Sequence, residues 1–171
     1  MADVNIRPAT RDDLPRLTEI YNYYVINTPI TFDLEPVTPE QRVGWFEEHT
    51  GTKRHRMLVA EDSGRVVGYA CTGPFRNKAA YDTSTETSIY CAHDATRRGI
   101  GAMLYRALFD ALKNEDINRL LGGITLPNEA SIKLHRKFGF TDVGVFTECG
   151  RKFNRYWDVV WMERPLRLDR E

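Results

Sequence analysis

Two short segments of this sequence have residues suited to holding a phosphate-bearing ligand. The first, Arg97-Arg98-Gly99-Ile100-Gly101-Ala102, stands just before a long apolar-periodic run. Glycines let the backbone come close to a ligand, and the free N–H groups of a helix's first turn favour an anion. The two arginines add charge that suits a pyrophosphate better than a carboxylate. A strand-to-helix turn with solvated arginines would have the same sequence, so this segment alone leaves both interpretations open.

The second segment, residues 128–140, begins with Asn128, contains His135 and ends with a Gly-Phe pair. A short helix is expected over 128–138, ended by Gly139, because glycine is a favoured residue at a helix C-terminus. A lone histidine on such a helix is more often a satisfied structural residue than a catalytic one.

A single carboxylate, Glu86, lies inside a stretch rich in Thr, Ile and Tyr, residues 83–92, that is typical of a strand. A carboxylate beside a bound amine can take its proton and so make the nitrogen a nucleophile. An outward-facing, solvated strand residue would carry the same side chain, and the residues alone favour that interpretation.

Hydrophobic periodicity predicts the elements that must position these residues. The clearest is a helix whose apolar face carries Ile100, Met103, Leu104, Ala107, Leu108, Ala111 and Leu112. Two earlier helices are expected after Thr10 and after the capping-box pair Thr38 and Gln41. Strands are expected at residues 4–7, 57–60, 66–71, 83–92, 119–126, 143–146 and 156–162. The order β-α-α-β-β-β-α-β-α-β-β predicts an α/β fold with a mixed sheet and helices on both faces.

Composition excludes several classes of protein. The 171 residues include 24 Lys+Arg and 24 Asp+Glu, so no broad positive field is available for nucleic acid or an anionic membrane. No apolar run approaches the roughly 18 residues that span a bilayer, and no secretory signal is visible. The cysteines, Cys71, Cys91 and Cys149, lack metal or redox spacing. We therefore expect one domain over residues 1–171, cytoplasmic and without a metal.

Together, the two segments resemble the acyl-CoA-binding core of the GNAT superfamily of N-acetyltransferases. Its pattern is an Arg/Gln-x-x-Gly-x-Gly/Ala loop followed, about thirty residues later, by Asn-x-x-Ala/Ser-x-x-Leu-Tyr-x-x-x-Gly-Phe. Two positions depart from it, because Thr96 replaces the Arg or Gln and His135 replaces the Tyr. The element order is similar too. The resemblance implies the GNAT acyl-CoA N-acyltransferase fold, with a mixed, mostly antiparallel sheet.

Within the superfamily the chain resembles the phosphinothricin and methionine sulfoximine N-acetyltransferases, from residue 6 to about residue 166. The stretches that carry this resemblance include Ile20-Tyr21-Asn22, Thr31-Phe32-Asp33, Gly68-Tyr69-Ala70, Glu86-Thr87-Ser88-Ile89-Tyr90 and Gly150-Arg151-Lys152-Phe153. It implies acetyl transfer from acetyl-CoA to the α-amine of a small amino-acid acceptor, and a homodimer. The biological role that the resemblance implies is resistance to an antibiotic or a herbicide.

By the same resemblance, acetyl-CoA is held by two groups of residues. Its pyrophosphate would lie on the N–H groups of Arg97, Arg98, Gly99, Ile100, Gly101 and Ala102. Its pantetheine arm would run alongside Ile89, Tyr90 and Cys91, where a β-bulge is expected to splay the sheet, with Asn128 on the other side.

The resemblance also assigns the chemistry. Glu86 is expected to be the general base, acting through water, and a backbone N–H near Cys91 to bind the oxyanion. His135 would either protonate the leaving thiolate or order the catalytic water. No covalent role is expected for the Cys91 thiol.

For the acceptor, Arg76 would bind the carboxylate in a bidentate pair, with Phe32 and Tyr81 as walls of the site. Arg76 as a surface loop charge remains an alternative. Other acceptors, namely a protein N-terminus, a polyamine or an aminoglycoside, stay open. So does a non-catalytic acyl-CoA sensor.

Overall fold

The computed structural model describes residues 4–95 and 99–166. Its strands are β1 (Asn5–Pro8), β2 (Met57–Asp62), β3 (Arg65–Pro74), β4 (Ser84–Cys91), β5 (Arg119–Thr125), β6 (Thr141–Lys152) and β7 (Arg155–Pro165). Its α-helices are α1 (Leu14–Asn27), α2 (Val43–Glu48), α3 (Ile100–Leu112) and α4 (Glu129–Lys137). This order of strands and helices confirms the predicted one.

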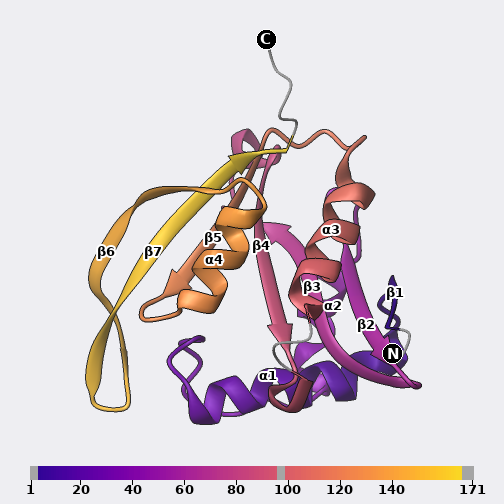
Figure 1. The fold of residues 1–171 in the computed structure, drawn as a ribbon, viewed down its shortest axis with the longest axis horizontal. Coiled ribbons are helices and arrows are strands. Elements are labelled where there is room, and N and C mark those ends of the chain that lie inside the picture. Colours follow the sequence, from indigo (N-terminus) through magenta and orange to yellow (C-terminus); the bar gives the residue numbers. More distant parts are fainter. Residues whose placement is uncertain (1–3, 96–98, 167–171) are drawn as a thin grey trace.

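The strands form one seven-stranded sheet in the order β1-β2-β3-β4-β5-β7-β6 (Figure 1). All its neighbouring strands pair antiparallel except β4 and β5, which are parallel. The mixed, mostly antiparallel sheet is therefore confirmed.

Local sequence signals explain where several elements begin and end. The Thr38 side chain accepts from the backbone N–H of Gln41 at 3.3 Å, and the Gln41 side chain accepts from the backbone N–H of Thr38 at 2.8 Å. This is the reciprocal pattern of a capping box. Asn128 caps α4 by accepting from the N–H of Ser131 at 3.2 Å, and Gly139 follows the helix with φ +83°. Left-handed backbone of this kind favours glycine.

The C-terminal hairpin is longer than predicted. Strands β6 and β7 have 12 and 11 residues, whereas alternation in the sequence marks only residues 143–146 and 156–162. A register shift between Phe146 and Gly150, with Glu148 at φ +51°, interrupts the alternation without ending the pairing.

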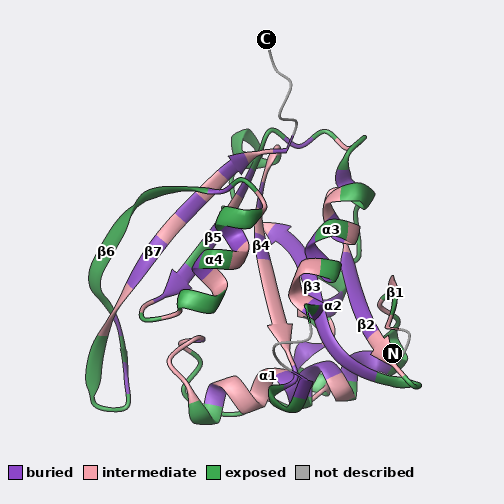
Figure 2. Cartoon of the chain, in the orientation of Figure 1, coloured by how far each residue is buried: buried purple, intermediate pink, exposed green. Residues whose placement is uncertain are grey.

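Helices cover both faces of the sheet. Tyr24 of α1 packs edge-on against Tyr90 of β4, with ring centroids 5.3 Å apart. Tyr105 of α3 instead reaches Thr87 of β4. Side chains alternate between the two faces of a strand, so Thr87 and Tyr90, three positions apart, point to opposite faces of the sheet. Helices α1 and α3 therefore lie on opposite sides of it. Figure 2 shows buried residues concentrated on the strands between these layers.

The buried face of α3 is rotated from the predicted one. Met103 is 37% exposed and Ala111 is exposed, whereas Tyr105, which the prediction left out, is fully buried. The residues that α3 buries are Ile100, Leu104, Tyr105, Leu108 and Leu112. An aromatic ring with a polar tip therefore enters the interior beside the sheet.

The sheet opens between β4 and β5. Their parallel pairing stops at Glu86 and Leu121, so residues 87–91 of β4 have no partner on β5. The expected β-bulge in β4 is wrong, because β4 pairs with β3 in unbroken register from Thr85 to Cys91. The opening arises because β5 turns away and leaves the regular edge of β4 uncovered.

Candidate active site

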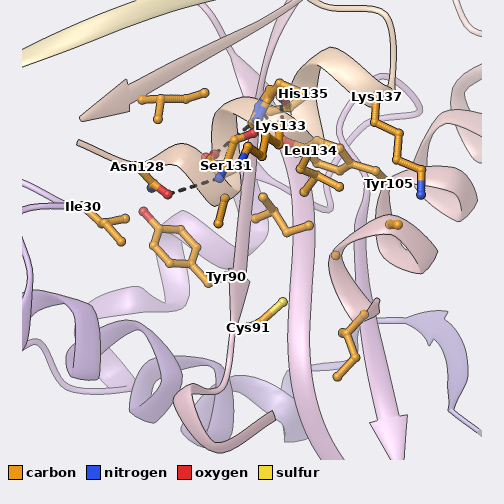
Figure 3. A pocket seen from close by; sticks show the side chains of 18 of the residues that line it. Ile30, Tyr90, Cys91, Tyr105, Asn128, Ser131, Lys133, Leu134, His135 and Lys137 are labelled. Carbon is orange, nitrogen blue, oxygen red and sulfur yellow. Dashed lines mark hydrogen bonds between the residues drawn. The ribbon is translucent and has the colours of Figure 1, made fainter. Parts of the chain in front are cut away.

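A cavity of about 530 Å³ occupies the opening between β4 and β5 (Figure 3). It is bounded by the edge of β4, the start of α3, the end of β5 and one side of α4. The predicted cofactor and catalytic residues that line it are Ile89, Tyr90, Cys91, Gly99, Ile100, Gly101, Ala102, Asn128 and His135. Arg97 and Arg98 lie outside the described residues, so their contact with a pyrophosphate stays a prediction.

The start of α3 has the geometry of an anion site. Gly99 adopts φ +75°, and its carbonyl already accepts from the N–H groups of Ala102 and Met103 at 3.0 and 3.1 Å. The N–H groups of Ile100 and Gly101 precede these bonds and point out of the helix end, where the helix dipole favours negative charge. A Cβ at Gly101 would lie 3.2 Å from Leu134 of α4, so this glycine lets the two helices approach.

The free edge of β4 offers peptide groups to an extended ligand. Ala92 donates to Val67 of β3 at 2.8 Å, so by alternation the N–H groups of Ile89 and Cys91 point toward the opening. The carbonyl of Cys91 accepts from the hydroxyl of Tyr24 at 2.5 Å. Across the cavity, the side chain of Asn128 lies beside the phenol of Tyr90 (Figure 3).

Several cavity residues were not found from the sequence. They include Thr87, Ser88, Tyr105, Ser131, Lys133 and Lys137. Lys133 and Lys137 are four residues apart on α4 and so lie one above the other on its surface. That spacing, directly after the Asn128 cap, is the signal that could have identified them as cations facing a phosphate.

His135 is buried, at 3% exposure, and both of its ring nitrogens are bonded. Nδ1 lies 2.8 Å from the carbonyl of Ser131, and Nε2 lies 2.9 Å from the hydroxyl of Tyr105. Burial lowers the pKa of His135 below its ordinary value, which favours the neutral imidazole. Neither nitrogen is therefore open to a thiolate or a water in this conformation, and the predicted catalytic contact stays a prediction.

Glu86 lies on the opposite face of β4 from Thr87, at the last residue that pairs with β5. It is half-buried, and among the described residues it has no hydrogen bond or ion pair. Burial raises the pKa of its carboxyl group above the ordinary value. A carboxylate whose pKa is raised toward neutrality is a better proton acceptor than a solvated one.

The predicted acceptor residues do not form one group. Arg76 and Tyr81 line a second cavity of about 490 Å³ that reaches Ser84 at the start of β4. The Arg76 guanidinium lies 5.6 Å from the Tyr81 ring centroid and has no ion pair with any described residue. Phe32 lines neither cavity; its ring packs against Gly150 of β6. The expectation that these three residues wall a common site is therefore not met.

The predicted oxyanion donor, a backbone N–H near Cys91, stays a prediction. A strand rises about 3.3 Å per residue, so Cys91 lies about 16 Å along β4 from Glu86. A base and an oxyanion donor for the same carbonyl must lie closer together. The N–H of Ile89, which points into the same opening, is nearer to Glu86 and better placed.

Two kinds of site are absent from residues 4–95 and 99–166. No group of three or more His, Cys, Asp or Glu side chains there could hold a metal ion. No helix there is long and apolar enough to cross a membrane.

A family model described as an acetyltransferase (GNAT) domain matches residues 6–161. The chain belongs to the GNAT acetyltransferase family. It is 53% identical over 167 residues to the phosphinothricin N-acetyltransferase of Streptomyces coelicolor, with 96% of this chain and 98% of that protein covered. It is 34% identical to the L-methionine sulfoximine/L-methionine sulfone acetyltransferase of Pseudomonas aeruginosa, covering 95% of this chain and 94% of that protein.

Solved structures of GNAT acetyltransferases have the same fold. A phosphinothricin acetyltransferase from Sinorhizobium meliloti in complex with acetyl-CoA has a TM-score of 0.90 and 33% identity, over 95% of this chain and 88% of that one. A ribosomal-protein-alanine N-acetyltransferase from Brucella melitensis has a TM-score of 0.90 and 39% identity, over 94% of this chain and 99% of that one. The predicted superfamily and fold are confirmed.

This GNAT chain is an N-acetyltransferase with acetyl-CoA as its acetyl donor. The cavity residues fit that molecule. The first turn of α3 offers N–H groups to a pyrophosphate, and the uncovered edge of β4 offers peptide groups to the amides of a pantetheine arm.

Proposed function

We propose that this enzyme acetylates the α-amine of a small amino-acid acceptor of the phosphinothricin or methionine sulfoximine type. The observation that carries the proposal is the place of Glu86. This half-buried carboxylate, which has no partner among the described residues, stands where β4 separates from β5, one residue before the cofactor cavity begins at Thr87. The names of two relatives, a phosphinothricin and a methionine sulfoximine acetyltransferase, support this acceptor class.

Glu86 acts as the general base, directly or through one water. An amino-acid acceptor arrives as an ammonium, which has no lone pair to attack with. Transfer of its proton to Glu86 frees the amine, which then attacks the thioester carbonyl while the N–H of Ile89 stabilises the oxyanion. Collapse breaks the C–S bond and forms the amide. The nitrogen loses a second proton after the attack, which balances the one taken up by the leaving thiolate, and the first proton passes from Glu86 to solvent.

Arg76 binds the carboxylate of the acceptor. It has no ion pair with any described residue, and it lines the cavity at the Ser84 end of β4, two residues from Glu86. A guanidinium can hold a carboxylate through two parallel hydrogen bonds, which fixes orientation as well as position. Tyr81 and Phe75 line the same cavity. Phe32 does not line it, and its ring packs against Gly150 of β6.

A screen of acceptors at saturating acetyl-CoA, followed by thiol release, tests the proposal. Phosphinothricin, methionine sulfoximine and methionine sulfone should be turned over well above the hydrolysis rate. Absence of turnover with every amino-acid analogue would refute the acceptor class.

A peptide acceptor is the second candidate. It is supported by the name of one structural neighbour, a ribosomal-protein-alanine N-acetyltransferase. Including peptides with N-terminal alanine in the same screen separates the two, because faster turnover of the peptides than of the amino acids would reverse the choice. Binding of CoA without turnover of any amine would instead indicate a sensor.

The outermost strand supports a homodimer. Strand β6 pairs only with β7, and its exposed side chains include Val143, Val145 and Phe146, at 60, 48 and 59% exposure. An open edge strand with exposed apolar residues is a usual site for pairing with another chain. Sedimentation should give a dimer mass for the native chain and a lower mass for Val145→Lys.

A further inference from the structure

A closed set of hydrogen bonds stands at the point where β4 and β5 separate. Thr87, the first residue of β4 beyond the pairing, donates its hydroxyl hydrogen to the carbonyl of Leu121 at 3.0 Å. Leu121 is the last residue of β5 that pairs with β4. The hydroxyl of Tyr105 lies 3.3 Å from the Thr87 oxygen and 2.9 Å from Nε2 of His135. Side chains from β4, α3 and α4 thus meet there.

The direction of each bond follows from the atoms involved. A carbonyl only accepts, so Nδ1 of His135 must carry the hydrogen that bonds Ser131, at 2.8 Å. In a neutral imidazole the other nitrogen, Nε2, then has a lone pair and no hydrogen. The Tyr105 hydroxyl has one hydrogen and two acceptors within reach, Nε2 of His135 at 2.9 Å and the Thr87 oxygen at 3.3 Å, and the shorter contact is the one to the Nε2 lone pair. The Thr87 hydrogen is already committed to the carbonyl of Leu121.

The surroundings leave His135 no alternative. Tyr105 is fully buried and Thr87 is 5% exposed, so no bulk water replaces their bonds. A Cβ on Gly122 would lie 2.8 Å from Nε2, which means that the imidazole rests directly on the backbone of β5. Phe140 packs against the same ring with centroids 4.9 Å apart. Among the described residues, Tyr105 is the titratable side chain that contacts the ring.

We propose that Tyr105 is a positioning residue of this acetyltransferase. By donating to Nε2 it holds His135 as the neutral, Nδ1-protonated tautomer and fixes the ring against Gly122, which sets the width of the opening beside the reacting thioester. His135 accordingly shapes the site and is not the acid that protonates the thiolate. The proposal depends on acetyl transfer but not on which amine is the acceptor.

Side-chain nitrogen NMR of the resting enzyme tests the tautomer without any variant. We expect His135 to show one protonated nitrogen, Nδ1, and to stay neutral from about pH 5.5 to pH 8, across the usual histidine range. A protonated Nε2, or a charged His135 at neutral pH, would overturn the proposal.

Tyr105→Phe tests the consequence for the reaction. The ring contacts remain, but Nε2 loses its donor, so the pKa of His135 should rise toward the ordinary histidine value. We expect kcat to fall about tenfold to a hundredfold, as for a displaced reacting group, with KM for acetyl-CoA within about twofold. We also expect a new loss of kcat on the acid side as the released His135 takes up a proton.

Tyr69→Phe is the matched control. Tyr69 is also fully buried beside β4, but its hydroxyl makes no hydrogen bond to any residue that the structure describes, so kcat and its pH profile should not change. If Tyr105→Phe keeps the native kcat and pH profile while its thermal stability is also unchanged, Tyr105 does not position the site. Failure of the native enzyme to turn over the chosen acceptor would count against that acceptor alone, since the NMR result stands without it.

Discussion

The two faces of β4 differ in how their polar groups are satisfied. On the face toward α3 and α4, Thr87 takes part in a closed set of hydrogen bonds with Tyr105 and His135. On the face toward α1 and α2, Glu86 has no partner among the described residues and its pKa is raised by burial. Strand β4 therefore separates two sides of the molecule. On the rigid side, the hydrogen bonds of Thr87, Tyr105 and His135 fix the geometry of the opening. On the open side, Glu86 is free to exchange a proton.

The same contrast distinguishes the two cavities. The cofactor cavity is built from helix ends and strand edges, whose backbone groups are fixed by the fold. The second cavity, with Arg76 and Tyr81, draws on the loop between β3 and β4. Binding residues on loops vary more easily than a scaffold does, so the acceptor can differ among relatives that share the donor.

Glu86→Gln should have the largest effect, since it removes a carboxylate on the open face that has no partner among the described residues. We expect turnover at neutral pH to fall by about 10²- to 10⁴-fold, the usual contribution of a general base. The affinity for CoA, measured by calorimetry, should stay within about twofold. Native kcat/KM should decrease as pH falls through the raised pKa of Glu86, because a protonated carboxyl group accepts no proton.

The pH dependence distinguishes this role from a structural one. In the Gln variant that acid limb should disappear, and turnover should recover as pH rises and the amine loses its proton to solvent. Glu47→Gln, at an exposed residue on α2, serves as the control and should keep the native profile. A Glu86→Gln profile parallel to the native one would show that the open face is not the proton acceptor.

Two adjacent glycines of β5 compare the faces directly. A Cβ at Gly122 would lie 2.8 Å from the His135 ring, whereas a Cβ at Gly123 would lie 3.2 Å from the Trp161 ring on the other face. Overpacking a filled site costs about 1–3 kcal/mol, so Gly122→Ala should lower the free energy of unfolding by that amount. Gly123→Ala should cost less than about 1 kcal/mol, because its Cβ contact is longer and Trp161 is only partly buried. Equal losses of unfolding free energy for the two variants in denaturant titrations would contradict the distinction between a rigid and an open side.

Sequence reasoning succeeded where backbone geometry decides the site. The start of a helix directly after Gly99 and the end of the next helix at Gly139 were predicted correctly, because both glycines adopt a left-handed backbone that few other residues take locally. The same reasoning failed for the cause of the opening. The sequence predicts a β-bulge in β4, but β4 is regular. The separation of β4 from β5 involves contacts between different elements, such as His135 of α4 against Gly122 of β5, which local sequence does not reveal.

Tyr105 shows why the rest was not predictable. Apolar periodicity selected Met103 and Ala111 for the buried face of α3, and a tyrosine within that helix carries no local sign that its hydroxyl will meet His135. The acceptor residues failed in a related way, because Phe32 contacts Gly150 across 118 positions of sequence. Contacts of this kind depend on the register of the C-terminal hairpin, which the alternation in the sequence did not define.

Arg76→Lys tests whether the open side recognises a carboxylate. Lysine keeps the charge but loses the paired hydrogen bonds, so KM for amino-acid acceptors should rise about tenfold, with kcat much less affected. An amine lacking a carboxylate should show no such change, which makes it the internal control. A similar rise for both acceptors would place Arg76 outside the acceptor site.

Lys137→Met should have the smallest effect, because this lysine lies at the solvent-exposed end of α4. Exposed charges contribute about 0.2–1 kcal/mol each, so the Kd for CoA should rise about twofold to fivefold at low salt. The difference should shrink as ionic strength increases, because salt screens exposed charges. Arg136→Met is the matched control, since Arg136 pairs with Asp142 at 2.9 Å and does not line the cavity.

Calorimetry with CoA and dephospho-CoA then identifies which phosphate of the cofactor Lys137 contacts. If the variant loses affinity for both equally, Lys137 faces the pyrophosphate, as a charge opposite the first turn of α3 should. If it loses affinity for neither, Lys137 does not contact the donor.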